Sequence, residues 1–264
     1  MNCKNKDKII KISIGENRTD KNWKNIEITW GDFCGKVRNT QRTKETMAEY
    51  SRYSPDVKTK IKDVGGFVGG TLADGLRTKR NVLSRSMLTL DMDNAKADTW
   101  QKIRTDSNLN FACCVYSTHK HRPNNPRYRL VIPLAGEITP NEYIAVSRII
   151  AHKIGIDLFD DTTYEPNRMM FWPSTSSDGE FFYDQKDGEF LDPQKLLQEN
   201  EDWNDDTKLP HSTKEKADEE NALAKKRRPY HKKGHCRCFL QNIFGDRCHN
   251  DISSRNIRSN GKLC

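Results

Sequence analysis

The sequence predicts an α+β fold, in which residues 86–190 form an RRM-like or ferredoxin-like β-α-β-β-α-β core and residues 1–85 form an N-terminal α/β layer. Two observations predict the core. Four segments are rich in β-forming residues, namely SMLTLDMD, FACCVYST, RYRLVIPL and RMMFWPS. Helical patterns follow the first and the third of them. In this topology the first and third strands are neighbours at the centre of the sheet.

The N-terminal layer is predicted from weaker patterns. Apolar residues alternate from Ile9 to Ile14, as in a strand, and a candidate helix contains Trp30 and Phe33. A basic, polar stretch then runs over residues 38–62.

The segment GGFVGGTLADGLRTKR follows, and Gly65, Gly66, Gly69 and Gly70 permit backbone shapes that are closed to other residues. Its basic residues Arg77, Lys79 and Arg80 are candidates for nucleic-acid binding. The spacing does not match a P-loop, so both a phosphate-contacting loop and a plain turn are compatible with it.

Within the core, ADTWQKIRTD suits a short helix, and a hairpin joins the second and third strands across KHRPNNP. The second helix has the clearest boundaries. Thr139 is its predicted N-cap, Pro140 its first residue and Glu142 the far end of a capping box, and Gly155 ends it. The segment RMMFWPS is then the predicted fourth strand.

Composition favours an anionic partner. The 264 residues carry a net charge of +8 with a pI near 9.0, and nucleic acid is the usual partner of such a chain, although solubility alone also explains the charge. There is no run of eighteen apolar residues and no signal peptide, so we expect a cytoplasmic protein with no membrane partner. The eight scattered cysteines do not suggest a disulfide framework.

The chemistry predicted for the core begins with Asp91 and Asp93. Two residues apart on a strand, their side chains leave the same face of the sheet. Carboxylates on an otherwise apolar strand need positive charge nearby, and a divalent cation supplies it. The alternative is a strand that emerges into solvent, with Asp93 and Asn94 starting a turn.

Other polar residues converge on the same sheet if the topology is right. They provide carboxylates, a histidine and arginines, the groups that bind Mg²⁺ or Mn²⁺ and a nucleoside triphosphate. Each is weak evidence alone, since a single His or Arg is more often a turn residue or a solvated charge. The set consists of Ser117, His119, Arg127, Arg129, Asp160, Asp161 and Arg168.

The segments LTLDMDNA, VYSTHKHRPNNPRYRLVIPL and FDDTTYEPNRMMFWPS resemble the three motifs of the archaeo-eukaryotic primase (AEP) superfamily. The resemblance is to the version at the N-terminus of phage and prophage DNA primases, and it covers residues 65–174 well. It implies that Asp91, Asp93 and Asp160 bind metal, with Asp161 as an alternative and Asp157 as a more distant one.

The resemblance also implies a function: DNA primase or primase-polymerase activity, with two-metal nucleotidyl transfer on single-stranded DNA in phage, prophage or plasmid replication. The catalytic residues are then Asp91, Asp93, Asp160 and His119. The nucleotide-binding residues are Ser117, His119, Arg127, Arg129 and Arg168. The implied cofactor is Mg²⁺ or Mn²⁺, and the implied partners are the template, nucleoside triphosphates and a replicative helicase that relatives carry downstream.

Two other functions use similar sheets. A rolling-circle replication endonuclease needs a His-x-His pair, which His119 and His121 superficially offer, but it leaves the two aspartates unexplained. A non-catalytic RNA or DNA binder needs stacking aromatics on the central strands, where this chain has Asp and Arg.

The sequence predicts one primase-like domain over residues 1–195 and a charged linker with a disordered or frameshifted tail over residues 196–264. Within this tail, residues 199–233 read as a flexible linker. The spacing of His235, Cys236, Cys238, Cys248 and His249 is not that of a standard zinc finger.

Overall fold

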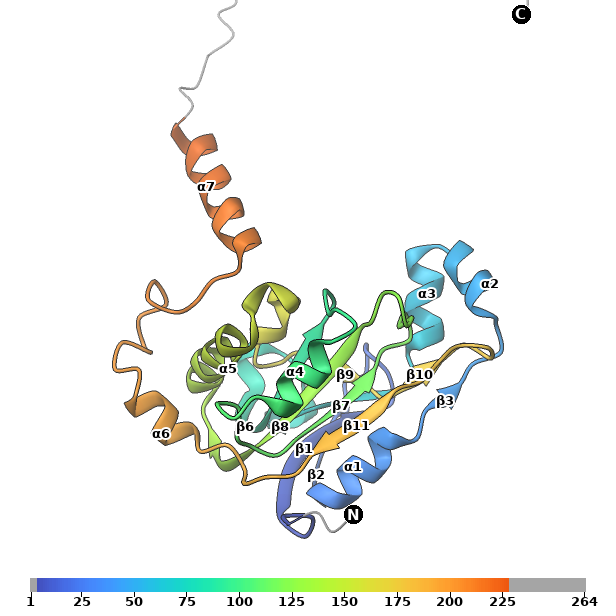
Figure 1. Ribbon diagram of the computed structural model, residues 1–264, viewed down its shortest axis with the longest axis horizontal. Helices are drawn as coiled ribbons and strands as arrows, with labels where there is room; N and C mark the ends of the chain where they lie inside the picture. Colours follow the sequence, from blue (N-terminus) through green and yellow to red (C-terminus); the bar gives the residue numbers. More distant parts are fainter. Residues whose placement is uncertain (1–3, 228–264) are drawn as a thin grey trace, which may run out of the picture.

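A five-stranded sheet forms the centre of the molecule in the computed structural model, which describes residues 4–227 (Figure 1). Its strand order is β11-β7-β8-β6-β5. The bounds are β5 Gly70–Leu72, β6 Val82–Met92, β7 Cys113–Ser117, β8 Tyr128–Ile138 and β11 Tyr183–Lys186.

The two long strands β6 and β8 pair antiparallel at the centre, which confirms the predicted neighbourhood of the first and third core strands. Their register places Asp91 opposite Arg129. The hairpin of β7 and β8 is also as predicted, and its register places Arg129 opposite Tyr116.

Helices α4 (Thr99–Thr105) and α5 (Pro140–Ile154) pack on one face of this sheet. The predicted start of α5 is confirmed, because Thr139 and Glu142 form a capping box, and Gly155 follows the helix with a φ of 125°. These helices cover the even-numbered residues of β6, from Leu88 to Met92. The odd-numbered residues of β6, which include Asp91, therefore face the other side. Asp93 follows the end of β6 and starts a turn with Asn94, as the alternative prediction for these two residues stated.

A second sheet covers part of that other side. Its strand order is β2-β1-β4-β9, and it shares an apolar core with helix α1 and with the inward side chains of β6, β7 and β8. The predicted N-terminal α/β layer is thus confirmed. The bounds are β1 Ile9–Gly15, β2 Lys24–Thr29, α1 Trp30–Arg38, β4 Gly66–Val68 and β9 Met170–Phe171.

The α+β fold class is confirmed, but the segment RMMFWPS differs from its predicted place as fourth strand of the core sheet. Met170–Phe171 is a strand (β9) that pairs with β4 in the second sheet, and the last residue of the segment, Ser174, begins the short strand β10 (Ser174–Thr175), which pairs with β3 (Gln41–Arg42). The edge beside β6 is taken by β5 instead. The strand β5 lies close to β4 in the chain and pairs with β6, so the place beside β6 is occupied. The strand β9 pairs with β4 instead.

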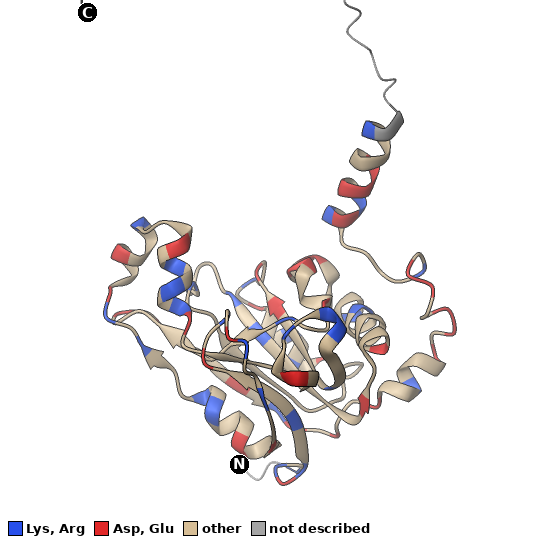
Figure 2. Ribbon diagram, turned by 180° about the vertical axis from the view of Figure 1, so that it is seen from behind, with Lys and Arg blue, Asp and Glu red and all other residues tan. Residues whose placement is uncertain are grey.

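Helices α2 (Met47–Arg52) and α3 (Pro55–Lys62) project together from one side of the sheets (Figure 1). They are fixed to the body by a parallel pair of short strands, β3 (Gln41–Arg42) and β10 (Ser174–Thr175). Seen from behind, Lys and Arg residues lie along α3 (Figure 2).

The packed core continues beyond residue 195, which differs from the predicted domain boundary. Helix α6 (Pro193–Gln198) buries Leu196 and Leu197, and Leu209 joins the same core cluster. These apolar residues are spaced too widely within a polar stretch to give a periodic signal. Helix α7 (Thr213–Arg227) then extends away from the body (Figure 1), and residues 228–264, including the zinc and frameshift candidates, lie outside the described part of the chain.

The glycine-rich segment forms β4 and β5 rather than an open phosphate loop. A side chain at Gly69 would overlap Met87, and one at Gly70 would overlap the backbone of Ser84 and Arg85 on β6. The glycines are thus required for the close approach of these strands. No helix in the described residues is long and apolar enough to cross a membrane.

We expect Gly70→Ala to destabilise the protein by about 2 kcal/mol or more, because the atoms that a methyl group would meet are backbone and cannot rotate away. Urea unfolding measures the change. Gly136→Ala is the matched control, since a Cβ at Gly136 in β8 meets no atom within 4 Å. Equal stability of the two variants would contradict the close-packing role.

Candidate active site

A polar cavity of about 180 Å³ lies at the end of β6 and β8, on the sheet face that looks away from α4 and α5. It joins segments that are distant in sequence, from α3 through β6 and β8 to the turn before β9. The lining residues are Lys62, Asp91, Asp93, Thr118, His119, Lys120, Arg127, Arg129, Asp160, Arg168, Phe171 and Ser174.

Asp91 and Arg129 form a buried cross-strand ion pair inside the cavity. The distance from Arg129 Nε to Asp91 Oδ1 is 3.7 Å, and neither atom makes a hydrogen bond. Burial raises the pKa of the Asp91 carboxyl, and the Arg129 guanidinium opposes that rise. A carboxylate oxygen without a hydrogen bond in a buried position is suited to receive a cation.

Asp93 and Asp160 each pair with an arginine as well. Arg127 lies 2.8 Å from Asp93, and Arg168 lies 2.9 Å from Asp160. The amide of Asp160 donates to the carbonyl of Asp91, which brings the second carboxylate-bearing segment against β6. All three aspartates predicted to bind metal therefore face one cavity.

The alternatives to Asp160 face elsewhere. Asp161 lies 3.5 Å from Lys214, and Asp157 accepts two hydrogen bonds from Thr213 at the start of α7. Neither lines the cavity. Of the three candidates that the sequence left open, the structure brings only Asp160 to Asp91 and Asp93.

His119 follows β7 and is buried, with both ring nitrogens engaged. Nδ1 is 2.9 Å from Ser174 Oγ, and Nε2 is 3.1 Å from Glu45 Oε1. The ring of Tyr50 lies 4.4 Å from the imidazole, centre to centre. Burial lowers the pKa of His119, while the Glu45 carboxylate acts in the opposite direction.

Ser117 is not brought to the cavity. Its hydroxyl accepts a hydrogen bond from the amide of Phe182, beside β11. It stands opposite Tyr128, on the sheet face that α4 and α5 cover. Strand periodicity explains this, because Tyr116 and Ser117 must point to opposite faces.

The basic residues after the glycines also lie outside the cavity lining. Arg77 donates to the carbonyls of Asn167 and Arg18, and Lys79 pairs with Glu165 at 3.1 Å. Arg80 is exposed. A role of these three residues in nucleic-acid binding stays a prediction.

In the described residues, no three His, Cys, Asp or Glu side chains are close enough together to hold a metal ion by themselves. This fits the chemistry of Mg²⁺, which proteins usually bind through one or two carboxylates, with waters and substrate phosphates as further ligands. Asp91, whose Oδ1 has no hydrogen-bond partner, and Asp93 both line the cavity, and their role as metal ligands stays a prediction.

Several cavity residues were not found from the sequence. Lys62, which lines the cavity, and Glu45, which contacts His119, come from the N-terminal layer, where the sequence shows only a polar, basic stretch. Ser174 and Phe171 follow the two predicted carboxylates of the last motif. In the sequence, Lys120 stands out only by its position between His119 and His121. Its neighbourhood to His119 is the one feature of the sequence that could have predicted its place in the cavity.

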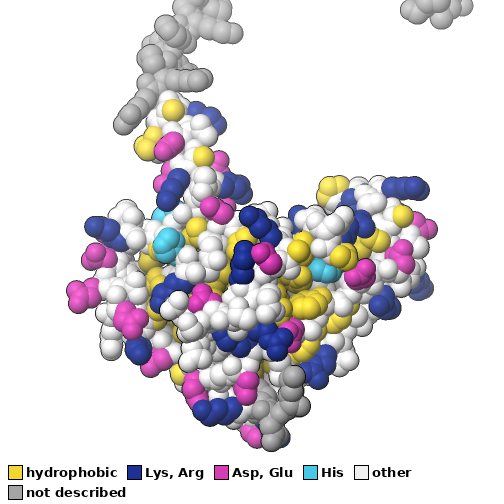
Figure 3. All heavy atoms as spheres, in the orientation of Figure 1, with side chains coloured by type: hydrophobic (Ala, Val, Ile, Leu, Met, Phe, Trp, Pro, Cys, Tyr) yellow, Lys and Arg dark blue, Asp and Glu magenta, His cyan; other side chains and the backbone are white. Residues whose placement is uncertain are grey.

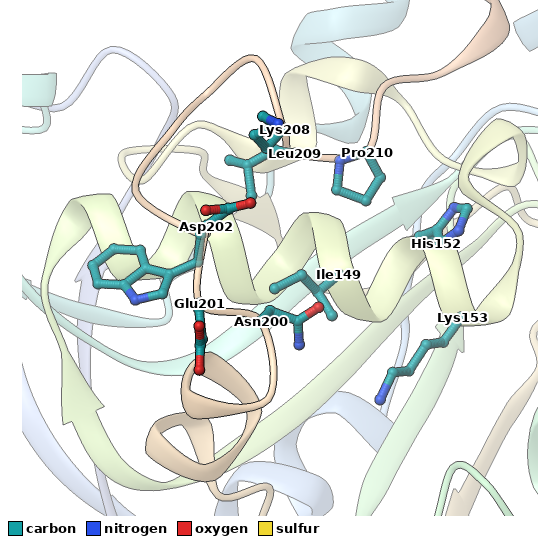
Figure 4. Close-up of a pocket in the computed structure, with 10 residues that line it drawn as sticks. Ile149, His152, Lys153, Asn200, Glu201, Asp202, Lys208, Leu209 and Pro210 are labelled. Atoms are coloured by element: carbon teal, nitrogen blue, oxygen red, sulfur yellow. The ribbon is translucent and has the colours of Figure 1, made fainter.

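A larger cavity of about 570 Å³ lies between α5 and residues 200–210 (Figure 4). Ile149, Leu209 and Pro210 line it together with scattered charges of both signs. It holds neither the paired aspartates nor any of the arginines described above. Size alone therefore does not mark the candidate active site.

The geometry gives no support to the two rival functions. His119 and His121 do not face a common point, because His121 Nδ1 accepts from the amide of Arg127 and its ring packs on Tyr128. On the sheet face that an RRM uses for stacking, Tyr116 is fully buried beneath the second layer.

The comparisons with known proteins give one family. The protein-family model described as "VapE N-terminal domain" matches residues 2–212 of this chain. No curated protein matches the chain.

Two solved structures are similar. The AEP domain of the cyanophage S-2L primase-polymerase has 14% identity and a TM-score of 0.39, over 73% of this chain and 88% of that one. The primase RepB′ has 10% identity and a TM-score of 0.35, over 86% of this chain and 65% of that one. At TM-scores below 0.5 these likenesses carry no argument about function.

We expect Glu45→Gln to lower the pKa of His119 further below its ordinary value of 6.5, because it removes the carboxylate that favours the charged imidazole. Titration of the His119 ring signals by NMR measures this. Glu27→Gln, in exposed β2, is the control. An unchanged or higher pKa in Glu45→Gln would show that Glu45 does not act on His119.

The pKa of His119 is lower in the folded protein than its ordinary value of 6.5 in the unfolded chain. The stability of the fold is therefore highest, with respect to this group, above about pH 6.5, and it decreases as the pH falls from 6.5 through the lowered pKa of the folded state. In Glu45→Gln the loss on acidification is expected to be larger. Urea unfolding at pH 7.5 and pH 5.5 measures the difference.

Proposed function

The chain belongs to the VapE N-terminal domain family, and we propose that it is the nucleotidyl-transferring domain of a DNA primase or primase-polymerase. One observation supports this above the others. Two aspartates at the end of β6, a third from a segment some seventy residues later, a buried histidine and three arginines all line one small cavity. Metal-binding carboxylates beside phosphate-binding cations are the groups that nucleotidyl transfer requires.

Asp91, Asp93 and Asp160 are the proposed metal ligands, and Mg²⁺ or Mn²⁺ is the proposed cofactor. The Asp91 Oδ1, which has no hydrogen-bond partner, and the cavity that all three aspartates line support this proposal. When bound, two such ions supply Lewis acidity for activating a primer 3′-hydroxyl and for stabilising the leaving pyrophosphate.

Arg127, Arg129 and Arg168 are the proposed triphosphate ligands. A guanidinium binds phosphate in the same bidentate way as it binds carboxylate. In this proposal the arginines that neutralise the aspartates turn to the triphosphate when the nucleotide arrives. Arg129 is best prepared for this change, because its Nε is buried without a hydrogen bond.

His119 is proposed to lie beside the phosphates as a neutral group. Its contacts to Glu45 and Ser174 fix the ring orientation, and its burial, which lowers its pKa, disfavours a proton on both nitrogens. Ser117 is included in the proposal only as a residue that supports the end of β7.

The proposed partners are nucleoside triphosphates, a single-stranded DNA template and a replicative helicase, and the proposed location is the cytoplasm of a phage- or prophage-carrying cell. The net charge of +8 supports a nucleic-acid partner. On the face shown in Figure 3, however, basic and acidic side chains are interspersed, so the charge does not gather in one patch there.

We expect Asp91→Asn and Asp93→Asn each to reduce primer synthesis by about a thousandfold or more, because each removes a proposed metal ligand. The measurement is incubation with single-stranded template, labelled nucleotides and Mg²⁺ or Mn²⁺, followed by sizing of the products. Asp98→Asn, whose exposed carboxylate pairs with Lys102, is the control.

Circular dichroism must show that the variants are folded. Template-dependent products from the Asp91→Asn, Asp93→Asn double variant at the rate of the unmodified chain would end the proposal. Products that are nicked DNA instead of new strands would favour the endonuclease.

A further inference from the structure

The five cations that line the cavity fall into two groups. Arg127, Arg129 and Arg168 each stand against an aspartate. Lys62 and Lys120 make no side-chain hydrogen bond or ion pair with any residue in the described part of the chain. Three carboxylates already face three guanidinium groups, so the two lysines provide positive charge that the protein itself does not neutralise.

Lys62 is the last residue of α3 and reaches the cavity from the projecting α2–α3 lobe. Its ammonium lies 5.1 Å from the ring centre of Phe171, so the side chain rests on an aromatic surface and is partly buried. An aromatic face holds a lysine in position without neutralising its charge.

Lys120 lines the same cavity from the turn between β7 and β8, directly after His119. It is exposed, whereas Lys62 is not. The turn and the end of α3 lie beside one another in Figure 1, and both lysines line the cavity.

The field around Lys62 is positive. Burial lowers its pKa first of all, and Arg129 and Lys120 lower it further, while Asp91 and Asp93 oppose them. Like charges brought together without a counter-charge cost free energy, and a bound anion removes that cost.

We propose that Lys62 and Lys120 form a phosphate-binding subsite that holds the phosphate groups of the incoming nucleoside triphosphate. This assignment rests on the proposed function and deepens it, because it gives the α2–α3 lobe a direct contact with substrate. Lys62 contributes from the end of α3 and Lys120 from the turn between β7 and β8, and Arg127 and Arg129 line the same cavity.

The position favours a nucleotide over the template as the source of the phosphate. Lys62 is half-buried in the same cavity as the three aspartates, so a ligand must enter the cavity to reach it. At about 180 Å³ the cavity is smaller than the roughly 300–1,000 Å³ of pockets that enclose a whole small molecule. Phosphate groups fit inside while the sugar and base remain outside.

The test compares Lys62→Gln and Lys120→Gln with Lys60→Gln in the full chain. Lys60 is an exposed lysine on the same helix, so its substitution removes the same charge without touching the cavity. Calorimetry in Mg²⁺ measures Kd for ATP and for inorganic tripolyphosphate, and fluorescence anisotropy measures Kd for a labelled single-stranded oligonucleotide. Thermal unfolding checks that each variant is folded.

We expect Lys62→Gln to weaken the binding of ATP and of tripolyphosphate about tenfold, since hydrogen bonds to charged groups contribute about 1.5–3 kcal/mol. Lys120→Gln should act in the same direction, and Lys60→Gln should change neither Kd more than about twofold. Oligonucleotide binding should be the same in all variants.

The subsite is ruled out if Lys62→Gln binds ATP and tripolyphosphate as the unmodified chain does, or if Lys60→Gln loses as much. If the variants weaken only the binding of the oligonucleotide, the lysines contact the template and not the nucleotide, and the proposal is equally overturned. If tripolyphosphate binding depends on Lys62 but the chain makes no primers, the subsite is supported and the proposed polymerase function is wrong. A chain that binds neither ligand would reject both.

Discussion

The buried pairing of Asp91 with Arg129 is the constraint on which the site depends. A single carboxylate or guanidinium in this position would be very costly to bury, and the two together remain tolerable because each faces the other across the β6–β8 ladder. The pair is not optimal for stability, since the facing atoms are too far apart for a hydrogen bond. Such residual mismatch is typical of groups that are kept for binding rather than for folding.

Strand parity extends this pair into a site. Asp93 and Arg127 repeat the same facing arrangement two residues farther along, at the open end of the strands. The second sheet covers the inner part of that face with an apolar core, so charges are excluded there and collect at the uncovered end. The segment after α5 then brings Asp160 against the backbone of Asp91, and β10 with residue Glu45 fixes His119 on the other side.

Local patterns predicted most of this arrangement. The period of two along β6 placed Asp91 and Asp93 on one face, and the capping signals of Thr139 and Glu142 fixed the start of α5. The same period, applied to β7, would have separated Ser117 from Tyr116 and from the cavity. What no local pattern contains is a pairing between distant short segments. The place of β9 beside β4, and the contact of Glu45 with His119, depend on tertiary packing of segments too short to have a periodicity of their own.

The pairing of each aspartate with an arginine has a thermodynamic consequence for the proposed reaction. A cation that binds Asp91, Asp93 or Asp160 competes with a guanidinium for the same carboxylate, so the metal alone gains little. A triphosphate alone competes with the carboxylate for the same guanidinium, and it also gains little. When both bind, the carboxylates take the metal and the arginines take the phosphates, so every charge that is released finds a new partner. In the proposed reaction, binding of metal and of nucleotide is therefore expected to be positively coupled, and by linkage each raises the affinity for the other by the same factor.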